Sequence, residues 1–224
     1  MALIPKRALD AYAMALEKAA GAAGRQASKA VMAFVSTNPE ATVAQVRDFA
    51  IQAVTNATAK YGGATSAISA ELFDEVMEAE GVEATRAEVW DGPDADAISQ
   101  GVRYQAGKLA SGDADGFLDG VSELASYHTR LAATLTVARS VSRAGRGVRY
   151  ARVPTRANPC PYCLMLASRG FVYRNEQTAG AGSHRHCTCV LVPGINGKTN
   201  VAGYDPDELF RRWRDGGSST EARD

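Results

Sequence analysis

The sequence lacks a long hydrophobic run. None of its 224 residues belongs to an apolar stretch that approaches the roughly 20 residues of a membrane-spanning helix. The first residues also lack the charge-free apolar core of a signal peptide, because Lys6, Arg7 and Asp10 lie there. We therefore expect no membrane association and a cytosol-like compartment. Hydrophobic residues make up 46% of the chain and charged residues 22%, which is typical of a globular protein and excludes general disorder.

Acidic residues are absent between Glu123 and Glu176, an interval rich in arginine. Residues 1–142 contain 12 Lys and Arg against 18 Asp and Glu, whereas residues 143–224 contain 13 against 7. This asymmetry favours a surface for phosphate groups or an acidic partner, although a solvated basic helix end and loop would give the same pattern. The candidate nucleic-acid or partner-binding residues are Arg143, Arg146, Arg149, Arg152 and Arg156.

Cysteine is absent outside residues 160–189, where all four cysteines of the chain lie. A disulfide framework would spread its cysteines through a small secreted chain, and this chain is neither small nor visibly secreted. Metal binding is therefore the leading interpretation. A set of buried or redox-inert thiols is the simpler alternative.

The first part of the chain has apolar residues at helical spacing and little β-branched alternation. Proline and glycine pairs, together with capping residues, mark the predicted helix ends. His128 falls on the apolar seam of the last of these helices, where a histidine is usually a core residue. The predicted helices lie before Asn38-Pro39, from Thr42 to Gly62-Gly63, around Ile68–Val76, from Ile98 to Leu109 and from Asp113 to Gly145, with Leu131 and Leu135 on the seam of the last one.

The character of the chain changes after Gly145. Val148–Val153 and Val190–Pro193 are predicted short strands, and Asp205-Pro206 is a good start for a last helix. We therefore predict a mainly α fold, in which a multi-helix region is followed by a small α+β zinc-binding lobe with short strands and a C-terminal helix. The predicted divisions are a helical domain (1–145), a zinc-knuckle lobe (146–203), a C-terminal helix (204–215) and a disordered tail (216–224).

The cysteines and two histidines form two clusters with the spacing of a zinc site. Cys160 and Cys163 are separated by two residues, which lets both thiolates reach one tetrahedral ion. A second cluster follows after 20 residues and can supply the other half of the site. A structural Zn²⁺ would add folding free energy to a lobe with few large apolar side chains. The expected ligands are Cys160 and Cys163 with two of His184, Cys187 and Cys189, and His186 is the weakest candidate.

Catalytic interpretations of the cysteines find less support in the sequence. A thioredoxin-type pair needs a βαβ context, and a cysteine protease needs one thiol activated by a base. A catalytic zinc needs an open ligand position and a general base, and the nearest acid, Glu176, lies in a polar loop. We therefore do not expect an enzyme.

One family resemblance covers residues 148–195. The string from Cys160-Pro-Tyr-Cys163 to Tyr173 is followed by His184-x-x-Cys-x-Cys189 and by a hydrophobic strand that ends in Pro193. This part of the chain resembles the tailed-phage minor head proteins of the MuF-type, or head morphogenesis, family, as found in phages and prophages of actinobacteria. The helical part resembles that family only in general character. The family's cysteine-histidine motif corresponds here to Cys160, Cys163, His184, Cys187 and Cys189.

The resemblance implies a minor capsid protein present in few copies in the virion, inside the capsid near the portal, and in the host cytoplasm during assembly. Its expected partners are the phage portal protein and, as a further candidate, the major capsid protein. Packaged DNA would be contacted through its backbone phosphates. The implied role is in head assembly or in DNA packaging and ejection. The alternative from another class is a zinc-dependent nucleic-acid-processing enzyme or toxin.

Overall fold

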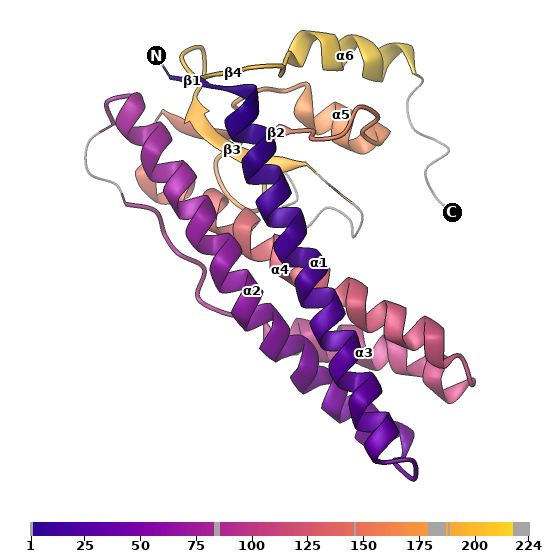
Figure 1. The fold of residues 1–224 in the computed structure, drawn as a ribbon. Helices are drawn as coiled ribbons and strands as arrows, with labels where there is room; N and C mark the ends of the chain where they lie inside the picture. Colours follow the sequence, from indigo (N-terminus) through magenta and orange to yellow (C-terminus); the bar gives the residue numbers. More distant parts are fainter. Residues whose placement is uncertain (1, 83–85, 146, 179–186, 188, 217–224) are drawn as a thin grey trace. The chain divides into compact units, whose positions relative to one another are not determined.

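A computed structural model describes residues 2–82, 86–145, 147–178, 187 and 189–216 of the chain. Within this part the fold is mainly helical with a few short strands, as predicted (Figure 1). The elements are β1 (Leu3–Ile4), α1 (Lys6–Thr37), α2 (Val43–Ala79), α3 (Ala95–Ala110), α4 (Ala114–Ala144), β2 (Val148–Val153), α5 (Pro161–Ala167), β3 (Val190–Ile195), β4 (Asn200–Val201) and α6 (Pro206–Asp215).

The chain forms two compact units, and α1, α2 and α4 each contribute residues to both of them. The first unit draws on residues 1–14, 67–89 and 134–224, and it contains all the strands together with α5 and α6. The second unit draws on residues 15–66 and 90–133 and consists of helices and their connections. The four cysteines therefore belong to the first unit.

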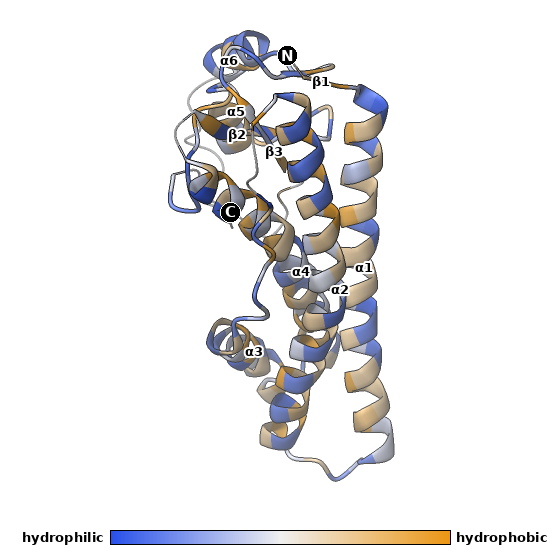
Figure 2. Cartoon of the chain, turned by 90° about the vertical axis from the view of Figure 1, so that its left-hand side faces the viewer, coloured by the Kyte–Doolittle hydropathy of each residue, from blue (hydrophilic) through white to orange (hydrophobic). Residues whose placement is uncertain are grey.

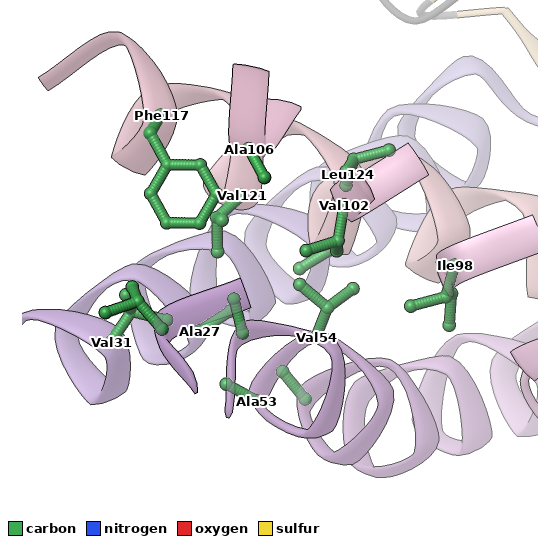
Figure 3. Packing of buried hydrophobic residues seen from close by; sticks show 14 of the residues in the cluster. Ala27, Val31, Ala53, Val54, Ile98, Val102, Ala106, Phe117, Val121 and Leu124 are labelled. Carbon is green, nitrogen blue, oxygen red and sulfur yellow. The ribbon is translucent and has the colours of Figure 1, made fainter. Parts of the chain in front are cut away.

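The core of the second unit is built from one face of each of its four helices. Figure 3 shows Val31 of α1, Val54 of α2, Val102 of α3 and Phe117 of α4 within a single apolar cluster, and all four are buried. Burial of such a face supplies most of the stability of a helix in a folded protein. Hydrophilic residues recur along each of the long helices (Figure 2). In the described part of the chain, no helix combines the length and the hydropathy that crossing a bilayer requires.

The predicted helix end at Gly62-Gly63 is wrong. α2 continues through both residues to Ala79, so the predicted second and third helices are one. Gly62 lies against the indole of Trp90, and a Cβ atom at this position would come within 2.7 Å of the Trp90 Cζ3 atom. Gly62 therefore leaves room for the Trp90 ring against the side of α2, and the helix continues past this glycine.

Three predicted helix starts are confirmed by their caps. Thr42 and Gln45 form a reciprocal capping box before α2, since the Thr42 amide donates to the Gln45 side chain and the Gln45 amide donates to the Thr42 hydroxyl. Asp113 accepts from the amide of Gly116 at the start of α4. Asp205 accepts from two amides in the first turn of α6.

The buried face of α4 differs in part from the predicted seam. His128 is buried, as expected of a core histidine, but Leu131 and Leu135 are only half-buried. The helix has 3.6 residues per turn, so its buried face departs from the predicted seam along this stretch. The positions that are buried there carry mostly small side chains. These positions include Ala132, Ala133, Thr136, Val137 and Ser140.

Both predicted strands exist and pair with each other. β2 and β3 are antiparallel, with Val148 opposite Ile195 and Val153 opposite Val190. The amide and carbonyl of Tyr150 both bond to Tyr173, so β2 lies between β3 and the Tyr173 segment. Pro193 faces Tyr150 from the other side at a non-hydrogen-bonded position, where a proline removes no ladder bond.

Candidate metal centre

The first two cysteines are placed by the start of α5. Cys160 precedes Pro161, has an extended backbone (φ −64°, ψ 157°) and is the N-cap of the helix. Its Sγ accepts a hydrogen bond from the Cys163 amide at 3.3 Å. This turn directs Cys163, one turn into α5, to the protein interior, where its side chain is buried.

The other two cysteines lie at the entrance to β3. Cys189 immediately precedes Val190, the first residue of the strand, and Cys187 is two residues earlier. The Cys163 and Cys187 sulfurs are 3.4 Å apart, and the three Sγ atoms of Cys163, Cys187 and Cys189 all lie within 4.8 Å of one another. These three residues are called the cysteine cluster below.

The cysteine cluster has the dimensions of a thiolate metal site. Sulfurs bound to one tetrahedral zinc at about 2.3 Å lie roughly 3.8 Å apart, which matches the spacing observed here. Thiolates favour soft and borderline ions such as zinc over magnesium or calcium. The described part of the chain thus brings together three of the predicted ligands in a geometry that can hold a metal ion.

The electrostatics of the cluster distinguish its members. Hydrogen bonds with the thiols of Cys163 and Cys189 lower the pKa of Cys187, and the nearby charge of Arg152 acts in the same direction. Hydrogen bonds with Cys187 and Cys189, together with burial, raise the pKa of Cys163. Cys187 is therefore the position where the cluster most readily carries a thiolate, the form that binds a metal.

Arg152 has a different position from the one expected of a partner-binding residue. It lies in β2 with only 2% of its surface exposed, and its Nη1 donates to the Cys187 sulfur at 3.5 Å. Its guanidinium therefore lies in the protein interior and not on a partner-binding surface. The sequence contains a signal for this position: Arg149 and Arg152 are an odd number of residues apart, so a strand must direct them to opposite faces.

The remaining candidate ligands are Cys160, His184 and His186. Cys160 adjoins the cysteine cluster through its hydrogen bond with Cys163 and is not one of the three grouped sulfurs. His184 and His186 lie outside the described residues. The expectation that His184 supplies a ligand therefore stays a prediction.

The other candidate arginines have varied surroundings. Arg143, in the last turn of α4, is 69% exposed and forms an ion pair with Glu88 at 3.4 Å. Arg149 is half-buried and donates to the carbonyl of Val148. Arg146 lies outside the described residues.

Arg156 is exposed and lines a surface cavity of about 360 Å³. Two further cations, Lys6 and Arg212, line the same cavity. Asp205 and Glu208 also line it, so the charge of its wall is mixed.

Comparison with known proteins identifies one family. A family model described as VG15 protein matches residues 4–216, which include the long helices and the cysteine cluster. No curated protein and no solved structure matches the chain. The chain therefore belongs to the VG15 protein family and, as the resemblance in residues 148–195 implied, is a phage protein.

Proposed function

We propose that this phage protein is a structural minor head protein of a tailed phage, associated with the portal inside the capsid and acting in head assembly or in DNA packaging and ejection. Membership of a phage family supports a role in the phage life cycle. The resemblance of residues 148–195 to MuF-type proteins supports the head and portal as its location. In this proposal the protein has no catalytic activity of its own.

The cysteine cluster is the observation that carries the molecular part of the proposal. Cys163, Cys187 and Cys189 come from two segments that are far apart in the sequence, yet their sulfurs lie within 4.8 Å of one another. A Zn²⁺ bound by these thiolates would link α5 to the start of β3. With a fourth ligand from the predicted set the site would be closed, and the ion would then supply cross-linking free energy and no chemistry.

Contact with packaged DNA is a further part of the proposal. The net positive charge of residues 143–224 supports it, and phosphate contacts need no base-reading element. Arg143 and Arg156 are exposed and suit such contacts, and Arg149 is half-buried. Arg152 is not included because its guanidinium is buried.

Quantitative mass spectrometry of purified phage particles tests the proposed location. The amounts of this chain, the portal protein and the major capsid protein are measured in the same particles. We expect this chain at a low, fixed ratio to the portal subunits, because a portal-associated component has a limited number of binding positions.

Particles that lack the chain despite its expression in infected cells would contradict the virion role. That result would favour the alternative, a zinc-dependent nucleic-acid-processing enzyme or toxin. Nuclease assays on the purified protein with and without a chelator would then test for activity.

A further inference from the structure

A buried arginine lies beside the cysteine cluster, where its positive charge can offset the negative charge of metal-bound thiolates. Arg152 occupies the central strand β2, between β3 and the Tyr173 segment, and is 2% exposed. One of its contacts is the hydrogen bond from its Nη1 to the Cys187 sulfur at 3.5 Å. A guanidinium is always charged, so this position holds a permanent positive charge next to three sulfurs.

The neighbouring arginine of the same strand shows that this placement is specific. Arg149 lies on the opposite face of β2, is half-buried, and donates to the carbonyl of Val148 next to it. A buried charge is unfavourable unless opposite charge lies nearby, because the surrounding protein solvates it less well than water does. The cysteine cluster provides negative charge at the required place when its sulfurs are thiolates.

We infer that Arg152 is a positioning residue of the metal centre: its guanidinium balances the charge of the metal-bound thiolates and orients Cys187. The inference rests on the proposed zinc site. Three thiolates and one divalent ion carry a net charge of −1, and a fourth thiolate would make this −2, so the guanidinium offsets all or part of the negative charge. Charge offset of this kind reduces the desolvation cost of an uncompensated charge in the interior.

The hydrogen bond adds an orienting effect. Groups in the second coordination sphere hold metal ligands in position, and their removal commonly weakens metal affinity by about 10- to 100-fold. Arg152 is bound to one ligand, is anchored in a paired strand, and is shielded from solvent. These are the properties of such a group.

Zinc affinity of the purified full-length protein tests the inference. Affinity is measured by competition with a chromogenic chelator for wild type, Arg152→Gln, Arg152→Lys and the control Arg156→Gln. Arg156 is exposed just beyond β2, so its substitution repeats the chemical change away from the cluster. We expect about 10- to 100-fold weaker binding for Arg152→Gln. Arg152→Lys should recover part of that loss because it keeps the charge, and Arg156→Gln should match wild type.

Thermal melts with and without chelator separate this role from a purely structural one. If Arg152 acts through the metal, Arg152→Gln reduces the increase in melting temperature that zinc gives to wild type. Equal destabilisation of Arg152→Gln in the presence and absence of zinc would overturn the inference, as would a zinc affinity within about twofold of wild type. Wild-type protein that binds no zinc would instead reject the proposed metal centre itself.

Discussion

The carboxylate of Glu80 accepts hydrogen bonds from two segments that are far apart in the sequence. It follows α2 directly, and its Oε1 accepts from the Ala2 amide at 2.8 Å and from the Thr199 hydroxyl at 2.7 Å. Ala2 and Thr199 immediately precede β1 and β4, which pair in parallel over only two residues each. So short a pair is marginal by itself. The carboxylate therefore helps to fix the first strand of the chain beside β4.

Replacement of this carboxylate should cost stability in a pH-dependent way. Burial raises the pKa of Glu80, but several opposing effects, which include its hydrogen bonds with Thr199 and Ala2, together outweigh burial, so the pKa lies below its ordinary value of 4.5. A lowered folded pKa gives stability that is present above the unfolded pKa and is lost as the pH falls through the folded pKa. We predict that Glu80→Gln lowers the free energy of unfolding by about 1 kcal/mol at pH 7.

Denaturant unfolding at pH 7 and pH 3 measures this effect. The difference between wild type and Glu80→Gln should shrink at pH 3, because that pH is below the ordinary glutamate pKa of 4.5 and the stabilisation is lost as the pH falls from there through the lowered folded pKa. Glu78→Gln is the matched control, since Glu78 is exposed at the end of the same helix and should show little effect at either pH. A Glu80→Gln difference that is the same at both pH values would contradict this account.

Residue types and their spacing in the sequence predict the role of the cysteines but not that of Arg152. The two-residue spacing of Cys160 and Cys163 and the nearby pair Cys187 and Cys189 predict a cluster, and the structure brings three of these sulfurs together. The burial of Arg152 is set by the order of strands, with β2 in the centre. That order depends on contacts distant in sequence, so a local pattern of arginines suggests a basic surface instead.

α2 shows why a glycine pair is ambiguous as a signal. In an isolated segment, Gly62 and Gly63 weaken a helix and favour its end. In the folded chain, the helix continues because Gly62 provides the space that the Trp90 ring fills. A Cβ atom at Gly63 would meet no heavy atom of the described residues within 4 Å, so this glycine has no comparable packing role.

Alanine at these two neighbouring positions should therefore have opposite effects. Gly62→Ala places a methyl group against the Trp90 ring and should destabilise the protein by about 1–3 kcal/mol. Gly63→Ala meets open space and should stabilise it by about 0.5–1 kcal/mol through the better helix propensity of alanine. Denaturant unfolding of both variants checks the pair, and each serves as the control of the other. Equal effects of the two substitutions would show that propensity, not packing, governs this helix.

The elements that the sequence predicts well have strong local signals. The long helices carry extended apolar periodicity, and residues such as Thr42, Asp113 and Asp205 mark their starts by capping. β1 and β4 have no such signal, because a strand of two residues is too short to show alternation. The contact with Glu80 helps to place them, and a sequence pattern does not show this contact.

At the scale of the whole molecule, burial of apolar side chains stabilises both units. The second unit has an extensive apolar cluster from four helices, which Figure 3 shows. The first unit also buries large side chains such as Phe73, Val141 and Tyr150, and α5 and α6 share a smaller cluster of Leu164, Ala167 and Leu209. A bound metal at the cysteine cluster would add to the stability of this unit, since all four cysteines lie in residues 160–189. The predicted domain boundaries at residues 145 and 203 stay a prediction.

Amide hydrogen exchange with and without a zinc chelator tests the central claim, that a metal-bound cysteine cluster holds the region around β2, α5 and β3 together. We predict that the chelator strongly reduces protection of amides in Val148–Val153, Pro161–Ala167 and Val190–Ile195. Amides of the helical core around Val54 and Val102 should keep their protection, because that core contains no metal ligand. Unchanged protection throughout the chain after complete removal of metal would contradict the claim.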